Sequence, residues 1–194
     1  NSLIRLILLF VTLFLMSVAG LNLYIDSKLP DENKIRDIDL QIPLKIFTAD
    51  NKLIGEFGEK RRTALEFSSI PVHYVNAVLA AEDDDFFNHS GVSYLGLARS
   101  LYRLAISGRV QGGGSTITMQ VAGNYLTSRD INIFRKIKDI FLAYRLEKTY
   151  SKEEIFEFYV NRIFFGNRAY GIAAASEVYY GASIKELNLA QWAM

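Results

Sequence analysis

A run of twenty residues without a charged side chain, from Leu6 to Ile25, constrains this 194-residue chain more than any other feature. A helix needs roughly 20 apolar residues to cross the hydrocarbon core of a bilayer. We therefore expect residues 1–25 to form one transmembrane anchor, and Arg5 before the run indicates a cytoplasmic N-terminus. The alternatives are a buried core helix and a cleaved signal peptide, whose apolar region is usually shorter, about 7–15 residues.

The composition excludes several classes of protein. Half of the residues are hydrophobic and 22% are charged, which excludes a disordered chain. Lys and Arg number 22 against 21 Asp and Glu, so no basic surplus indicates a nucleic-acid partner. The chain contains no cysteine, which excludes disulfides, thiolate catalysis and cysteine-ligated zinc.

After the anchor, the pattern of apolar residues changes once. Residues 26–70 are expected to form a juxtamembrane linker and a small β-hairpin, with alternating apolar residues on either side of a turn at 49–52. Helical periodicity then continues from residue 71 to 194 and predicts a mainly α-helical domain that is cut before its end. The expected helices are 71–85, 92–108, 116–126, 131–149, 152–161, 171–179 and 184–194.

The first candidate site is Glu82, at the start of an acidic run that continues through Asp85. Helical steps back from Glu82 reach Leu79, Val78 and Val75, so this carboxylate continues an apolar stripe. Partial desolvation, the negative end of its own helix and the following aspartates should raise its pKa, as a general base requires. A solvated acidic helix end is the alternative. His73 and His89 lack the spacing of a metal pair, so no metal site is predicted.

Two further segments are candidates for binding an anionic group of a ligand. The glycines at 112–114 precede Ser115 and Thr116, either of which can cap a helix whose first N–H groups attract a phosphate. On the helix that begins near Arg135, apolar residues on two sides indicate burial, and Asp139 lies one turn after Arg135. This pair is either a structural ion pair or a functional carboxylate beside a cation. We expect the charged residues at 147–157 to form an ordinary solvated face.

Five segments, in this order, resemble the motifs of the peptidoglycan glycosyltransferase domain of class A penicillin-binding proteins: EDDDFFNHSG, GGSTITMQ, RKIKD with FLAYRLE, KEEIFEFYVN and FFGNRAYGIAAASEVYYG. The resemblance extends from about Gln41 to the end of the chain. It implies an α-helical, lysozyme-like domain that polymerises lipid II into glycan strands, with inversion, from an undecaprenyl-diphosphate-linked donor. It also implies a single-pass protein of the cytoplasmic (inner) membrane whose catalytic domain lies on the periplasmic or extracellular side.

The resemblance assigns roles to the residues that match its motifs. Glu82 matches the general base that deprotonates the acceptor sugar, and Asp139 stands at the second catalytic carboxylate. The predicted substrate-binding residues are Asp83, Phe86, His89, Ser115, Thr116, Gln120, Asn124, Arg135 and Lys136. The implied partners are lipid II, the nascent glycan strand, membrane lipid and other cell-wall synthesis proteins. The one candidate cofactor is a divalent cation at the diphosphate.

Two positions depart from the family's pattern. Asp139 stands where the family has glutamate, which sets the carboxylate back by about 1.5 Å. Gly123 stands where the family usually has lysine or arginine. These departures support one alternative, a weakly active scaffold of the cell-wall synthesis machinery. A second alternative is a lysozyme-like or lytic peptidoglycan-cleaving enzyme, which would also use an acid in a helical domain. The chain has no Ser-x-x-Lys tetrad, so any transpeptidase activity is expected to lie beyond Met194.

Overall fold

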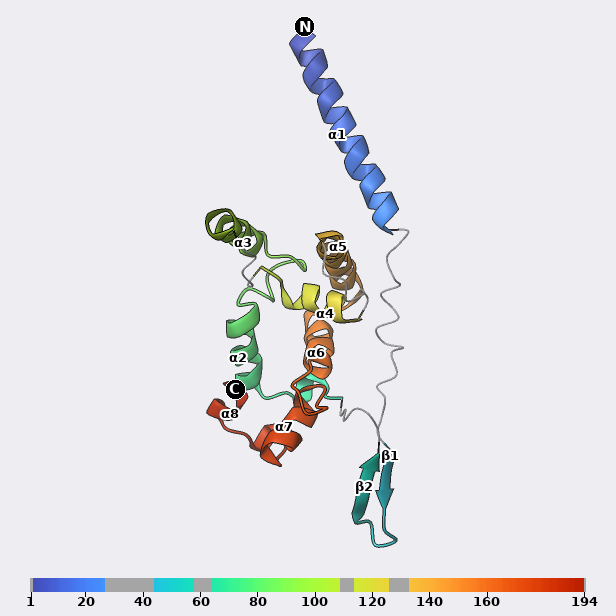
Figure 1. Cartoon of the computed structure of the whole chain (residues 1–194), viewed down its shortest axis with the longest axis vertical. Coiled ribbons are helices and arrows are strands. Elements are labelled where there is room, and N and C mark those ends of the chain that lie inside the picture. The colour runs from blue at the N-terminus through green and yellow to red at the C-terminus, as the bar shows by residue number, and fades with distance from the viewer. Residues whose placement is uncertain (1, 27–43, 58–63, 109–113, 126–132, 194) are drawn as a thin grey trace. The chain divides into compact units, whose positions relative to one another are not determined.

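The computed structural model of the chain describes residues 2–26, 44–57, 64–108, 114–125 and 133–193 (Figure 1). Two compact units are distinguished, Asn1–Asp31 and Glu32–Met194. In the first, helix α1 spans Ser2–Asp26 and exposes apolar side chains such as Leu6 and Phe10. Among the residues described here, no helix combines the length and the hydropathy of a membrane span.

The predicted hairpin is confirmed. Strands β1 (Leu44–Phe47) and β2 (Leu53–Phe57) pair antiparallel in a two-stranded sheet, with Ile46 opposite Gly55. The Thr48 hydroxyl closes the turn by accepting a hydrogen bond from the Lys52 amide at 2.9 Å.

The mainly helical prediction is also confirmed. The helices are α2 (Val72–Glu82), α3 (Tyr94–Ser107), α4 (Ile117–Tyr125), α5 (Ile133–Thr149), α6 (Lys152–Arg162), α7 (Ile172–Tyr180) and α8 (Leu189–Ala193), with 3₁₀ helices η2 (Phe67–Ser69) and η3 (Ile184–Glu186). The predicted domain boundaries at 25 and 70 stay predictions.

Two helix ends differ from the expectation. Helix α2 stops at Glu82 rather than at residue 85, because the backbone of Asp83 leaves the helical region with φ −163° and ψ 79°. The predicted helix over 184–194 is divided into η3 and α8. Ser183 begins the first with a capping box, and the Asn188 side chain accepts a hydrogen bond from the Gln191 amide at the start of the second.

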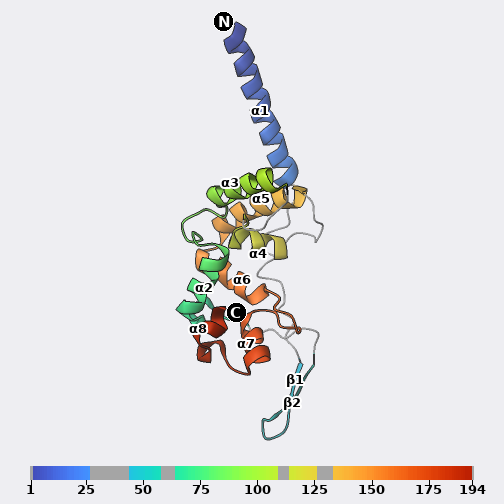
Figure 2. The ribbon, with the colours of Figure 1, turned by 60° about the vertical axis from the view of Figure 1, so that its left-hand side comes forward.

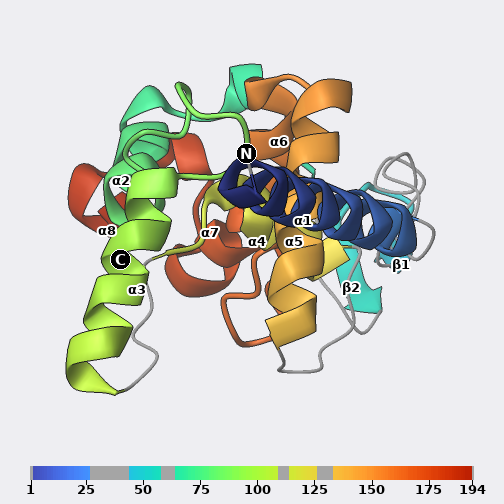
Figure 3. The same ribbon diagram turned by 90° about the horizontal axis from the view of Figure 1, so that it is seen from above.

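Helix α4 lies at the core of the second unit, where it packs against α5 and α6 (Figures 1 and 2). Most of its side chains are buried, because a helix without a continuous polar face has no side suited to solvent. Helix α2 packs beside α8 (Figure 3), and the ring of His73 stacks on that of Trp192 with centroids 5.9 Å apart. Helices α2 and α4 both belong to the second unit.

Candidate active site

Glu82 is the last residue of α2, and its side chain opens to solvent. Its Oε2 accepts a hydrogen bond from Nε2 of Gln120 on α4, at 2.8 Å. Glu82 also lines a cavity of about 780 Å³ whose wall is largely apolar and aromatic. The cavity is bordered by residues of α2, α6, α7 and α8, among them Tyr74, Val78, Tyr159, Tyr179 and Trp192.

The position of Glu82 confirms one expectation and corrects another. Glu82 shares the cavity wall with Val78, one turn earlier, so it does continue the apolar stripe of α2. The expected partial shielding of Glu82 from solvent is wrong, because the helix ends at this residue and leaves its carboxylate exposed. An incoming substrate could therefore reach this carboxylate beside the apolar cavity wall.

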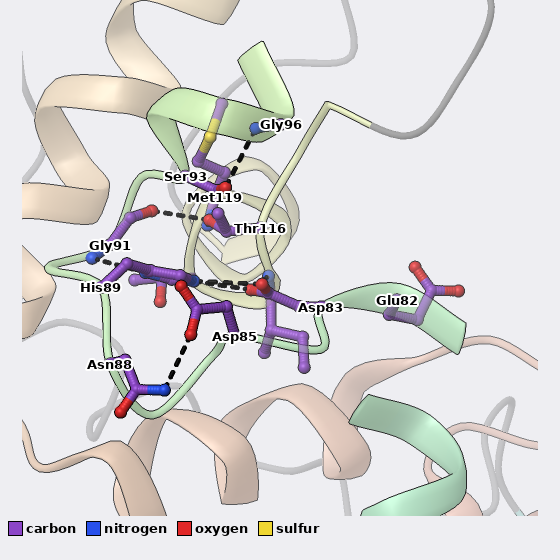
Figure 4. A network of polar contacts seen from close by, with 12 residues as sticks. Glu82, Asp83, Asp85, Asn88, His89, Gly91, Ser93, Gly96, Thr116 and Met119 are labelled. Atoms are coloured by element: carbon purple, nitrogen blue, oxygen red, sulfur yellow. Dashed lines mark hydrogen bonds and ion pairs between the residues drawn. The ribbon is translucent and has the colours of Figure 1, made fainter. Parts of the chain in front are cut away.

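The next residue, Asp83, has the opposite environment. Its carboxylate is buried and lies 2.9 Å and 3.1 Å from Nε2 of His89. The same carboxylate accepts a hydrogen bond from the backbone amide of Ile117, the first residue of α4, at 3.0 Å. Figure 4 shows that Glu82 points away from this pair. Asp83 therefore joins the end of α2 to the start of α4.

The hydrogen bonds assign the tautomer of His89. The Gly91 amide donates to Nδ1 at 3.1 Å, so Nδ1 carries no proton and Nε2 donates to Asp83. Phe86, in the same turn, is 0% exposed. These placements favour a structural role for Asp83, Phe86 and His89 over the predicted direct contact with substrate.

Two backbone amides at the start of α4 are bonded to side chains of the domain itself. Thr116 is buried, and its hydroxyl accepts from the Met119 amide at 3.1 Å while donating to the Gly91 carbonyl at 2.6 Å. Because Asp83 already occupies the Ile117 amide, the anion at this helix start is a carboxylate of the chain itself. The helix cap is thus confirmed at Thr116, whereas the predicted phosphate site, part of which falls on residues 109–113 outside the described ranges, stays a prediction.

Helices α4 and α5 bring the remaining predicted residues together. Gln120 and Asn124 lie one turn apart on α4, and Asn124 is exposed. Asp139 on α5 is 3% exposed and lies 3.9 Å from Nε of Arg135. A Cβ atom built on Gly123 would lie 3.5 Å from Oδ2 of Asp139, so the two departures from the family's pattern are neighbours in space.

Lys136 is the partly buried cation of this group. Its ammonium donates a hydrogen bond to the Ser115 hydroxyl. Burial lowers the pKa of Lys136 below its usual value of 10.5, Asp139 opposes this shift, and Arg135 adds to it. A bound anion would favour the charged form of such a lysine.

Two charged residues that the sequence places on a solvated face lie inside the domain instead. The Lys152 ammonium lies 2.7 Å from Oε1 of Glu147, and the two side chains are 17% and 9% exposed. Thr118, fully buried on α4, also donates to Oε1 of Glu147 at 2.6 Å. The expectation for these two residues is wrong, because charge interleaving along the chain carries no signal for a partner on another helix.

Two buried phenols line the cavity near Glu82. Burial raises the pKa of Tyr74, and the neighbouring Tyr159 adds to this shift. Burial also raises the pKa of Tyr159, with a contribution from the negative charge of Glu82. Glu82 and the Tyr159 phenol line the same cavity.

The described residues offer no ready metal centre. Within the ranges given above, no group of three or more His, Cys, Asp or Glu side chains could hold a metal ion. The expected divalent cation at the diphosphate stays a prediction.

Comparisons with known proteins agree on one family. A family model described as Transglycosylase matches residues 50–194. Penicillin-binding protein 1A of Pseudomonas aeruginosa is 51% identical over 180 residues, which are 93% of this chain and 22% of that protein. Penicillin-binding protein 1A of Escherichia coli is 43% identical over 178 residues, 92% of this chain and 21% of that protein.

The chain thus spans about a fifth of the length of these curated relatives. Among solved structures, penicillin-binding protein 1A from Haemophilus influenzae is 29% identical, covering 80% of this chain and 14% of that one, with a TM-score of 0.38.

Proposed function

Since this chain belongs to the transglycosylase family, we propose that it is a peptidoglycan glycosyltransferase that polymerises lipid II into glycan strands for the cell wall. The observation that carries this proposal is the contrast between two adjacent carboxylates. Glu82 is exposed at the wall of a cavity, whereas Asp83 is buried and bonded to His89 and to α4. Only Glu82 of the two is therefore placed to react with a substrate.

In the proposed reaction, Glu82 is the general base. Its carboxylate takes the proton of the acceptor sugar hydroxyl while that oxygen attacks the anomeric carbon of the donor. The bond from the anomeric carbon to the diphosphate oxygen breaks, and the configuration inverts. Because Gln120 holds Oε2 of Glu82, we expect Oε1 to receive the proton.

The leaving diphosphate would be bound by the cations of α5. Lys136 binds Ser115, just before α4, and Arg135 lies beside Asp139, which neighbours Gly123 on α4. Asn124 offers an exposed amide next to Gly123. Asp139 would act as the second carboxylate by holding the Arg135 guanidinium. A divalent cation carried with the diphosphate is compatible with this arrangement.

We place the reaction at the outer face of the cytoplasmic membrane, because both substrates carry lipid tails. The uncharged run Leu6–Ile25 supports an anchor in α1. Helix α3 also exposes apolar side chains on one face, including Leu95, Tyr102 and Ile106. If this placement is correct, the chain sediments with membranes after extraction at alkaline pH, and recovery in the supernatant would contradict it.

The test of the function is the product formed from lipid II. We expect the wild-type chain to lengthen lipid II into glycan strands on a gel and to leave finished peptidoglycan intact. Glu82→Gln should lower the rate by at least about a hundredfold, in the range that general bases contribute. Asp84→Asn, an exposed neighbour on the same turn, is the matched control.

The same experiment separates the competing functions. Cleavage of finished peptidoglycan would indicate a lytic enzyme, and lipid II binding without turnover would indicate a scaffold. Wild-type rates in Glu82→Gln would contradict the assignment of the base.

A further inference from the structure

The ammonium of Lys152, at the start of α6, has three partners that come from other parts of the domain. It donates to the backbone carbonyl of His89 at 2.6 Å and lies 2.7 Å from Oε1 of Glu147. It also lies 4.5 Å from the centroid of the Phe86 ring, in the geometry of a cation–π contact. Lys152 therefore ties α5 and α6 to the turn that follows Glu82.

The carboxylate of Glu147 keeps this cation in place. Its Oε1 accepts hydrogen bonds from both Lys152 and Thr118, and its side chain is nearly buried. Replacing a buried ion pair by apolar residues of similar volume is often neutral or stabilising. Stability of the fold alone is thus a weak reason for a lysine and a glutamate at these positions.

A series of contacts links the turn that Lys152 holds to both sides of Glu82. His89, whose carbonyl Lys152 binds, donates from its ring to Asp83. Asp83 directly follows Glu82 and holds the first amide of α4. Helix α4 in turn carries Gln120, which donates to Glu82. A shift of the turn would therefore move Glu82 and its hydrogen-bond partner relative to each other.

We propose that Lys152 is a positioning residue for the reaction: held by Glu147, it fixes the Asp83–Gly91 turn against α4 and thereby sets the place of the Glu82 carboxylate beside Gln120. This inference rests on the proposed function for its kinetic consequence. Misplacement of a catalytic group by about 1 Å can cost about a hundredfold in rate. Lys152 itself touches the turn and no reacting atom.

The first test is the double variant Lys152→Met with Glu147→Gln. It removes both charges together, and the glutamine oxygen can still accept from Thr118, so no unpaired buried charge remains. We expect a folded protein with an unchanged urea midpoint, a kcat for glycan polymerisation lowered tenfold or more, and a KM for lipid II within threefold of wild type. Lys148→Met, at the exposed neighbouring position of α5, is the matched control. A folded double variant with kcat within twofold of wild type would overturn the proposal.

The absence of cysteine from the chain allows a second, isosteric test. The Lys152→Cys variant is unfolded and its cysteine is alkylated. Bromoethylamine restores an ammonium at nearly the reach of the lysine side chain, and bromopropane gives a side chain of the same length without the charge. After refolding, we expect the aminoethyl form to recover most of the wild-type kcat and the propyl form to stay near the unmodified variant. Equal activity of the two alkylated forms would show that the charge and its hydrogen bonds do not matter.

A third measurement does not depend on activity. The chain has two histidines, so the ring nitrogen signals of His89 can be assigned by NMR with the help of His73→Gln. In the wild type we expect protonation at Nε2 and slow exchange of the Gly91 amide. The double variant should broaden or shift these signals and speed that exchange. Unchanged signals would overturn the inference, whereas a wild-type chain without glycan product would contradict only the proposed function.

Discussion

Substitution of Gly91 by alanine should destabilise the domain more than the same change at any exposed turn. Gly91 has φ +89°, where a side chain costs about 1–2 kcal/mol. Its added Cβ would lie 2.9 Å from the carbonyl oxygen of Ala143 and 3.0 Å from Cγ of Glu147. Overpacking of this kind costs about 1–3 kcal/mol, so we expect Gly91→Ala to lower the free energy of unfolding by about 2–5 kcal/mol.

Gly181→Ala is the control that separates the two costs. Gly181 ends α7 with φ +64°, and no atom lies within 4 Å of its added Cβ, so only the backbone cost of about 1–2 kcal/mol applies. Urea unfolding followed by far-ultraviolet circular dichroism measures both variants. A loss of stability at Gly91→Ala no larger than at Gly181→Ala would refute the reasoning, because it would show that the turn does not press against α5.

Two further predictions concern Asp139 and Tyr74. Asp139→Glu should preserve or raise the rate of glycan polymerisation. Gly123 has no Cβ atom, and the place where one would lie, 3.5 Å from Oδ2 of Asp139, leaves room for the added methylene. A large loss of rate would show a site built around aspartate. Burial raises the pKa of Tyr74 above its usual value of 10.0. Above pH 10, Tyr74 therefore binds fewer protons in the unfolded chain than in the folded one. The free energy of unfolding then falls as the pH rises. Tyr74→Phe should flatten this fall by up to about 1.4 kcal/mol per pH unit, as urea midpoints at pH 9 and 11 would show; an identical slope would contradict the shift.

The sequence was sufficient for the features that depend on neighbours along the chain. Helical periodicity located α3 to α7 within a few residues, and the turn at 49–52 located the hairpin. A hydroxyl just before an apolar helix is a local signal, so the sequence predicts a cap at Ser115 or Thr116, and Thr116 forms it. Each of these inferences uses residues within a few positions of one another.

Contacts between distant segments could not be predicted in the same way. Asp83 ends α2 early and bonds to an amide 34 residues later, while Lys152 binds a carbonyl 63 residues before it. A sequence shows that a helix start can attract an anion, but not whether that anion is a ligand or a carboxylate of the chain. At the amide of Ile117, the first residue of α4, the anion is the Asp83 carboxylate.

The early end of α2 explains how two neighbouring carboxylates acquire different chemistry. If the helix continued to residue 85, Glu82 and Asp83 would lie about 100° apart on one regular helix. Instead, the backbone turns at Asp83, whose side chain is directed inward to His89 and Ile117, while Glu82 stays on the cavity wall beside Gln120. Burial and hydrogen bonds commit Asp83 to holding α4. The accessible carboxylate is thereby carried by a rigid helix end, fixed on one side by the turn and on the other by α4, which is the arrangement that a positioned general base needs.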